Sequence, residues 1–111
     1  MNEKLVVFVS CDGKEQAERI AGAVVEERLA ACVNVLPGVR SCYMWEGKRT
    51  WSEEVLLVMK TTAEVFGALE KRVLALHSYE IPEIVGLGIE AGSERYLQWV
   101  RDAVILPSSI F

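Results

Sequence analysis

The feature that most constrains this chain is a long predicted β-hairpin between Val33 and Lys60. Along its first arm two sets of side chains alternate at period two, with Val39, Ser41, Tyr43 and Trp45 on one face and Arg40, Cys42 and Met44 on the other. Glu46-Gly47-Lys48 forms the predicted turn, where Gly47 can take a positive φ. Pro37-Gly38 interrupts the first arm, and a strand tolerates proline only at an edge or a bulge.

The length of this hairpin predicts an oligomer. An arm of about a dozen residues spans roughly 40 Å at ~3.3 Å per residue, whereas a globule of this chain length has a radius of gyration of about 13 Å. The hairpin should therefore extend beyond its own domain and carry large apolar side chains with it, namely Tyr43, Met44, Trp45 and Trp51. We expect this distal part to pack on another copy of the chain; the alternative is a hairpin that bends back at Pro37-Gly38 within the monomer.

Composition excludes several classes of protein. With 111 residues the chain (1–111) is expected to form a single domain, and a hydrophobic content of 51% argues against disorder. A net charge of -4 and a pI near 5.0 argue against a nucleic-acid partner. The apolar run that begins at Leu5 is too short for a signal peptide or a membrane span, which predicts a cytoplasmic protein.

The remaining elements follow from periodicity and from their start and stop signals. Residues 4–10 read as a buried strand, and Asp12 with Glu15 resembles a capping box before a helix that runs to about Leu29. Thr61 or Thr62 should cap a second helix that ends before Pro82, and Ser93 should cap a third that Pro107 stops. Residues 84–90 read as a strand, and residues 106–111 as a short strand or a docked tail.

This order, β-α-β-β-α-β with an extra C-terminal helix, predicts an α+β, ferredoxin-like sandwich. In that fold two helices cover one face of a single antiparallel sheet. The other face would be bare in a monomer, which is a second argument for oligomerisation.

The densest polar cluster lies between the second helix and the strand after it, and contains His77, Tyr79, Glu80 and Glu83. His77 is expected in the last helical turn, where the helix dipole favours its cationic form, so it could be a ligand, a general base or a pH switch. The alternative is a helix end followed by a turn that Pro82 restrains. The fold also allows His77 to meet Cys11, at the end of the first strand, in a copper or zinc site.

The other candidate site residues can also be explained by structural roles. Cys32 and Cys42 show no metal-ligand spacing and are expected to be small apolar fillers. Lys60, which emerges from an apolar strand, is either a snorkelling edge residue or a buried charge paired with Glu80 or Glu83. The aromatic residues could line a ligand pocket or form interface core: Tyr43, Trp45, Trp51 and Trp99.

Four segments together resemble the CutA divalent-cation tolerance family: ACVNVLPGVRSCYMWEGK from Ala31, VMKTT from Val58, HSYEIPEIV from His77 and AGSERYLQWV from Ala91. The match covers nearly the whole chain in order. It implies a ferredoxin-like homotrimer with interlocking hairpins, an architecture similar to the PII signalling trimers. It also implies an association with tolerance to copper and other divalent ions, copper binding in some members, and no general enzymatic activity.

The resemblance also implies site residues. The family's metal ligands, a cysteine at the end of the first strand and histidines at the end of the second helix, correspond here to Cys11, or its neighbour Ser10, and to His77. Leu76-His77 stands where some members have two histidines. The candidate residues of a cleft between subunits are Tyr43, Trp45, Lys60, Tyr79, Glu80 and Glu83.

Three hypotheses follow for function. The first is a trimeric divalent-cation tolerance protein that binds copper or another divalent ion and has a PII-like signalling or ligand-binding role. The second is an enzyme that uses His77, Glu80 or Glu83 as acid or base. The third is a structural, anchoring trimer that binds no ligand.

Overall fold

The computed structural model describes residues 3–107. Its elements follow in the predicted order: β1 (Lys4–Cys11), α1 (Lys14–Glu26), β2 (Cys32–Trp45), β3 (Lys48–Thr62), α2 (Ala63–Leu76), β4 (Ile84–Gly88) and α3 (Glu94–Ala103). All strand pairs are antiparallel and the sheet order is β2-β3-β1-β4. This is the predicted α+β, ferredoxin-like arrangement, with one additional helix at its C-terminal end.

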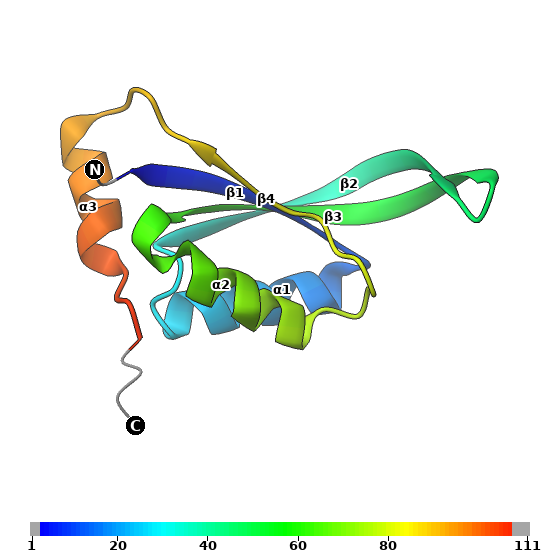
Figure 1. The fold of residues 1–111 in the computed structure, drawn as a ribbon, viewed down its shortest axis with the longest axis horizontal. Helices are drawn as coiled ribbons and strands as arrows, with labels where there is room; N and C mark the ends of the chain where they lie inside the picture. Colours follow the sequence, from blue (N-terminus) through cyan, green and yellow to red (C-terminus); the bar gives the residue numbers. More distant parts are fainter. Residues whose placement is uncertain (1–2, 108–111) are drawn as a thin grey trace.

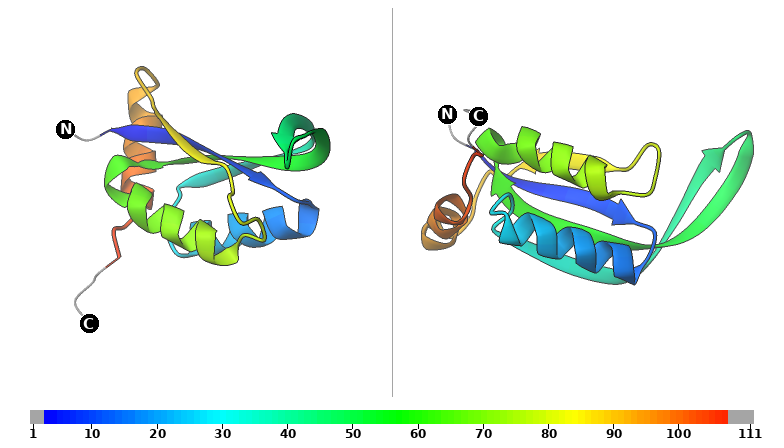
Figure 2. Two further views of the ribbon diagram at one scale, coloured as in Figure 1. Left: turned by 45° about the vertical axis from the view of Figure 1, so that its right-hand side comes forward. Right: turned by 90° about the horizontal axis from the view of Figure 1, so that it is seen from below.

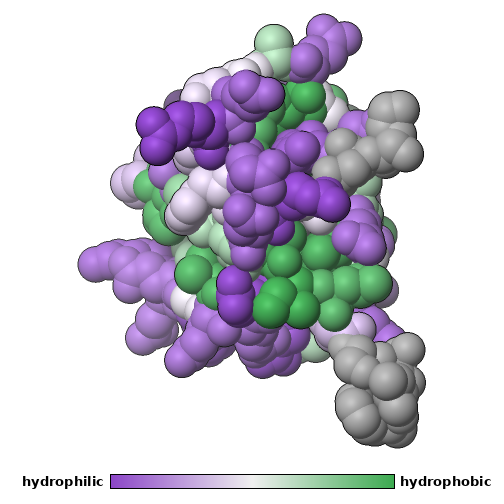
Figure 3. All heavy atoms as spheres, turned by 90° about the vertical axis from the view of Figure 1, so that its left-hand side faces the viewer, coloured by the Kyte–Doolittle hydropathy of each residue, from purple (hydrophilic) through white to green (hydrophobic). Residues whose placement is uncertain are grey.

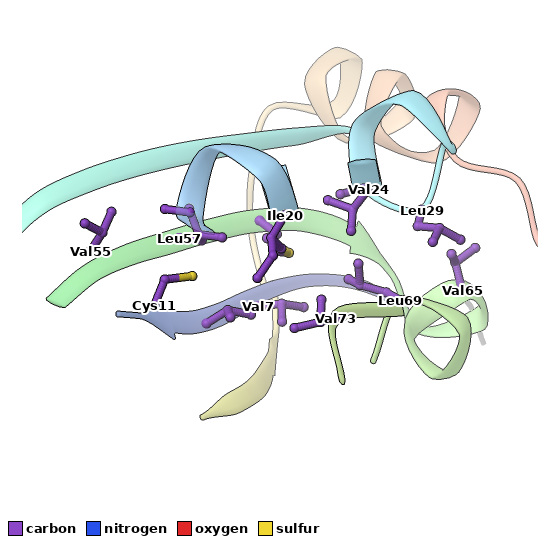
Figure 4. Close-up of a cluster of buried hydrophobic side chains, with 14 residues drawn as sticks. Val7, Cys11, Ile20, Val24, Leu29, Val55, Leu57, Val65, Leu69 and Val73 are labelled. Carbon is purple, nitrogen blue, oxygen red and sulfur yellow. The ribbon is translucent and has the colours of Figure 1, made fainter. Parts of the chain in front are cut away.

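Helices α1 and α2 lie side by side on one face of the sheet (Figures 1 and 2). Directly paired strand residues such as Val7 and Met59, or Val9 and Leu57, point to that face and are fully buried. They pack against Ile20 and Val24 of α1 and against Leu69 and Val73 of α2 (Figure 4). The 3.6-residue apolar stripes of the helices and the alternate residues of the strands therefore meet in one core.

The opposite face of the sheet, here called the open face, is not covered by α1 or α2. The strand register places on it the apolar residues Val6, Phe8, Leu36, Leu56, Val58, Val85 and Leu87. Leu87 is 53% exposed. Helix α3 lies at the end of the sheet farthest from the hairpin tip (Figure 1), where hydrophobic surface is interspersed with polar groups (Figure 3). No helix of residues 3–107 is long and apolar enough to cross a membrane.

The hairpin is as long as predicted. β1 accompanies β3 only as far as the pair Cys11–Val55, so the part of the hairpin from Val39 to Glu54 continues as a two-stranded ribbon. This distal ribbon projects from the body of the molecule (Figure 1). The longest extent of the whole molecule, ribbon included, is 43 Å. The turn is tighter than expected: Glu46 and Gly47 both have positive φ, 51° and 80°, and Lys48 already pairs with Trp45. This is the two-residue, type I′ geometry that suits the twist of a hairpin.

A β-bulge at Pro37-Gly38 reverses which side chains face the open side. Two residues of β2 stand opposite Val55 alone, and Gly38 has a φ of 80°. Before the bulge, Val33 and Val35 pair with Met59 and Leu57 and so face the helices. After it, the odd-numbered residues Ser41, Tyr43 and Trp45 pair with Ser52, Thr50 and Lys48 and face the other way. A bulge inserts one extra residue into one strand, and a shift of one residue moves the alternate side chains of that strand to the opposite face of the sheet.

Two predicted helix starts differ in detail. Asp12 does not cap α1: Gly13 is the N-cap, and Asp12 N–H instead donates to Gln16 Oε1 at 3.3 Å. Thr62 is the N-cap of α2, but its hydroxyl makes no capping bond. Ser93 caps α3 as predicted, accepting from Tyr96 N–H at 3.4 Å.

The helix ends also differ from the prediction. Helix α1 ends at Glu26, short of Leu29, and Arg28 has a positive φ of 62°. His77 is the C-cap of α2 with an extended backbone (ψ 145°), not a residue of its last turn. Helix α3 ends at Ala103, before Pro107. At this helix end the Arg28 side chain donates to the carbonyls of Asp102 and Ala103. Residues 104–107 form no strand, and residues 108–111 of the predicted tail lie outside the described residues.

Candidate functional site

A cleft of about 610 Å³ lies between the base of the distal ribbon and the segment that follows α2. Its lining comes from β1, β2, β3 and that segment: Ser10, Ser41, Cys42, Tyr43, Trp45, Glu54, Tyr79, Glu80, Ile81 and Glu83. The bulge is what places Ser41, Tyr43 and Trp45 on this side of the hairpin.

Glu54 is the buried acidic group of the cleft. It is 8% exposed, and it stands in β3 at the point where the apolar run begins. Its Oε1 accepts a hydrogen bond from Ser41 Oγ at 2.6 Å, and its Oε2 accepts one from Tyr79 Oη at 2.8 Å. Because each oxygen accepts from a different hydroxyl group, the carboxyl group is held in one orientation.

Tyr79 is positioned from both ends. Its backbone N–H donates to His77 Nδ1 at 3.1 Å, and its ring lies 4.8 Å from the His77 ring. Burial raises the pKa of the Tyr79 phenol, and the hydrogen bond to Glu54 and the Glu54 charge raise it further. The phenol therefore keeps its proton and remains a donor to Glu54.

The segment from His77 to Glu83 is tied to the end of β1 by two further bonds. Ser10 Oγ donates to Glu83 Oε1 at 2.8 Å. Since His77 Nδ1 accepts from Tyr79, its Nε2 carries the proton and donates to the Ser10 carbonyl at 2.7 Å. These bonds hold an irregular segment in place, while Glu80 and Ile81 lie exposed at the rim.

The cleft is acidic and has no counter-charge in its lining. It presents the carboxylates of Glu54, Glu80 and Glu83 and no lysine, arginine or histidine. Among residues 3–107 the ion pairs join Lys14 to Glu18 and Arg72 to Glu27, all outside the cleft. Tyr43, Trp45 and Tyr79 add aromatic rings, whose faces attract cations. This arrangement favours a positively charged ligand.

The structure brings five of the predicted cleft residues together within one chain: Tyr43, Trp45, Tyr79, Glu80 and Glu83. It does not bring Lys60 to them. Lys60 lies six positions beyond Glu54 on β3, about 20 Å along the strand, and its Nζ donates to Asn34 Oδ1. Within this chain Lys60 therefore pairs with neither Glu80 nor Glu83, and its place in a cleft between subunits stays a prediction.

The predicted metal ligands are close neighbours in the fold but are not arranged as a metal centre. Cys11 is fully buried among core side chains (Figure 4), and burial, with the Glu54 charge, raises the pKa of its thiol to about 11. Both ring nitrogens of His77 are engaged in hydrogen bonds. In the described part of the chain no three His, Cys, Asp or Glu side chains are grouped to hold a metal. As arranged, these residues do not fit a bound metal, and ligation by Cys11 and His77 stays a prediction.

Sequence reasoning missed Glu54 and Ser41, the centre of the hydrogen-bond network. Ser41 was assigned correctly to the face of Tyr43 and Trp45, but Glu54 looked like one of several polar residues in the second arm. The available signal was its position next to Val55, where the buried run begins. A carboxylate at such a boundary is buried only if it finds partners.

Comparison with known proteins identifies the family. The model for "CutA1 divalent ion tolerance protein" matches residues 5–103. The "Divalent-cation tolerance protein CutA" of Thermus thermophilus is 50% identical over 97 residues, which cover 87% of this chain and 94% of that protein. "Protein CutA" of Homo sapiens is 47% identical over 85% of this chain, and the chain spans 52% of its length.

Solved structures agree with the sequence relatives. The structure of the Thermus thermophilus Cut A1 protein superposes with a TM-score of 0.89 at 48% identity, covering 91% of this chain and 98% of that one. The structure titled "Periplasmic divalent cation tolerance protein CutA from Archaeoglobus fulgidus" gives 0.89 at 36% identity, covering 92% of this chain and 99% of that one. The chain belongs to the CutA1 divalent ion tolerance family.

Proposed function

We propose that this protein, with residues 1–111 as one domain, is a homotrimeric cation-binding protein of divalent-ion tolerance. The acidic cleft beside Glu54 is the site at which the cation acts. The observation that carries this proposal is a buried carboxylate, held by Ser41 and Tyr79, in a cleft without a cationic lining residue. Burying an anion without a counter-charge is costly, and a bound cation would relieve that cost.

Copper is the first ion to test, followed by zinc and other divalent ions, because the family is named for divalent-ion tolerance. The carboxylates of Glu80 and Glu83 are oxygen donors at the rim, and Cys11 and His77 are soft donors directly behind the Ser10 wall. For Cys11 and His77 to bind a metal ion, His77 would have to break its hydrogen bond to Ser10 and the buried Cys11 thiol would have to become accessible.

The biological role we propose is PII-like: ligand binding in the cleft changes the surface that a trimer presents to a partner, in the cytoplasm. The distal ribbon and the open face support the trimer, since both leave apolar side chains exposed in a single chain. The enzymatic alternative has less support, because His77 lies outside the cleft lining with both nitrogens hydrogen-bonded.

Isothermal titration calorimetry with copper and zinc chlorides tests the proposal. The two donor sets are separated by Glu80→Gln and Glu83→Gln on one side and by Cys11→Ser and His77→Ala on the other. Glu70→Gln, an exposed glutamate of α2 outside the cleft, is the matched control. Weaker binding in the first pair places the ion in the cleft, and weaker binding in the second pair assigns it to the thiol and imidazole. No binding to wild-type protein, or equal binding in all variants, would refute metal binding at this region.

A further inference from the structure

The turn after α1 contains an arginine in a backbone conformation that usually selects glycine. Helix α1 closes with a Schellman motif, in which Leu29 N–H donates to the Val24 carbonyl at 2.8 Å. In the same motif Arg28 N–H donates to the Val25 carbonyl at 3.0 Å, and Arg28 takes the left-handed position with a φ of 62°. Glycine adopts this conformation without a steric penalty, so an arginine here indicates that its side chain has a further role.

The Arg28 side chain holds the C-terminal end of α3. Its guanidinium donates from Nε to the Ala103 carbonyl at 3.0 Å and from Nη2 to the Asp102 carbonyl at 3.2 Å. The backbone adds a third bond, because the Arg28 carbonyl accepts from Ile105 N–H at 3.0 Å. The last carbonyls of a helix have no partner within the helix and carry partial negative charge, which a guanidinium group complements.

These bonds to Arg28 are the hydrogen bonds that tie α3 to the rest of the fold. Among residues 3–107, every hydrogen bond between residues 94–107 and the chain before Ser93 ends at Arg28, and no ion pair joins the two parts. The remaining attachment is apolar: Val100 is fully buried, and Val104 packs against the core. A segment held in this way can detach as a unit at a lower free-energy cost than the strands, which share ladders of hydrogen bonds.

The residue before Arg28 connects the same turn to α2. Arg72 donates from Nε and from Nη2 to the two carboxylate oxygens of Glu27, at 3.0 Å each. One turn therefore joins α1 to α2 through the side chain of Glu27 and to α3 through the side chain of Arg28. Because the two contacts use different side chains, they can be broken one at a time.

We propose that Arg28 is a latch for α3, meaning that this one residue decides whether the helix stays docked. With the latch closed, α3 and residues 104–107 lie at the end of the sheet (Figure 1), and the Tyr96 and Trp99 rings are stacked at 5.7 Å on the helix. With the latch open, α3 and residues 104–107 detach by local unfolding while the sheet, α1 and α2 remain folded. The latch thus controls the surface that this end of the molecule presents, whatever the cleft binds.

Hydrogen–deuterium exchange of the intact protein, followed by mass spectrometry of peptides from α3 and from β1, tests the latch. Arg28→Gly removes the guanidinium and suits a φ of 62°, so this variant should fold. We expect its α3 amides to exchange at least about tenfold faster than in wild type, because two charge-assisted hydrogen bonds are lost, and its β1 amides to exchange at the wild-type rate. Arg72→Gln, which breaks the contact with Glu27 instead, should leave α3 exchange unchanged.

Arg28→Lys keeps the positive charge but loses the fork of donors, so its α3 exchange should lie between those of wild type and Arg28→Gly. Wild-type exchange of α3 in Arg28→Gly would overturn the proposal and leave Arg28 as a residue that only ends α1. Equal acceleration of α3 and β1 would also overturn it, because the variant would then have lost global stability. The same holds if Arg72→Gln accelerates α3 exchange as much as Arg28→Gly does.

Discussion

At the scale of single residues, the adjacent buried hydroxyls of Thr61 and Thr62 differ in hydrogen bonding. Thr61 Oγ1 donates to the Leu29 carbonyl at 2.7 Å. Thr62 Oγ1 is buried without a hydrogen-bond partner among the described residues. Thr61→Val should destabilise the protein by about 1–2 kcal/mol, because it leaves the Leu29 carbonyl unpaired. Thr62→Val should change stability by less than about 0.5 kcal/mol or increase it, since no bond is lost.

Urea denaturation of the two threonine variants, each with the same change of volume and polarity, measures both effects. Equal destabilisation of the two would contradict the hydrogen-bond assignment at this junction of β3 and α2.

The phenol of Tyr79 makes stability depend on alkaline pH. Its folded-state pKa lies above the ordinary value of 10.0, because of burial and of Glu54. The folded state therefore retains this proton more tightly than the unfolded state, so the contribution to stability is complete below pH 10 and is lost as pH rises above it. We expect Tyr79→Phe to lose less stability than wild type between pH 8 and pH 11.

Urea midpoints at the two pH values test this dependence. Tyr43→Phe, whose hydroxyl contacts Ser52 and not Glu54, is the control and should lose as much as wild type. A Tyr79→Phe variant with an undiminished alkaline loss would contradict the coupling to Glu54.

The thiol of Cys11 should be inert in the folded protein. It is fully buried and its pKa is raised to about 11, so the reactive thiolate is scarce and inaccessible at pH 8. Iodoacetamide labelling followed by mass spectrometry should modify Cys11 only after denaturant is added. Rapid modification of Cys11 in native protein would show that the end of β1 opens readily, which would in turn favour its use as a metal ligand.

At the scale of elements, the hairpin turn carries a correctable strain. Glu46 has a φ of 51°, a conformation that costs a non-glycine residue about 1–2 kcal/mol and that asparagine adopts more readily. Glu46→Asn should raise stability by about 0.5–1 kcal/mol, whereas Gly47→Ala, at a φ of 80°, should lower it by about 1–2 kcal/mol. Thermal unfolding of the two variants gives opposite shifts if the turn has this geometry. Shifts of the same sign would rule that geometry out.

The elements were predictable to different degrees for a physical reason. Periodicity identified every helix and strand, because apolar spacing reports the face that each element buries. Helix ends were less predictable, since the contacts made there involve residues distant in sequence: Arg28 bonds the last carbonyls of α3, and His77, just beyond α2, bonds Ser10. The cleft was half predictable: Tyr79, Glu80 and Glu83 stood out as a polar cluster, but Glu54 became central only through its cross-strand bond to Ser41.

At the scale of the whole molecule, one chain leaves an incomplete surface. The open face exposes Val85 and Leu87 by 45% and 53%, and the distal ribbon exposes Met44 and Trp51 by 65% and 53%. Patches of this kind mark interfaces between proteins. We expect light scattering to give about three times the chain mass of 12.4 kDa.

The variant Leu87→Lys should reduce that mass towards one chain by placing a charge on the open face. Leu74→Lys is its control, because Leu74 is similarly exposed (49%) but lies on α2, on the other side of the sheet. A wild-type mass of one chain would refute the trimer. Dissociation by Leu74→Lys alone would place the interface on the helices.

The bulge at Pro37-Gly38 has a consequence for how this molecule can evolve. Cross-strand pairing sets the direction of each side chain, and Pro37 and Gly38 together stand opposite Val55 alone. Loss of one of these two residues would remove the bulge and leave Ser41, Tyr43 and Trp45 paired with the same residues of β3, on the side of Glu54. Loss of both would shift the rest of β2 by one residue against β3 and turn these three of the ten residues that line the cleft to the opposite face. The hairpin can therefore lose the bulge, but not both of its residues, if the cleft is to persist.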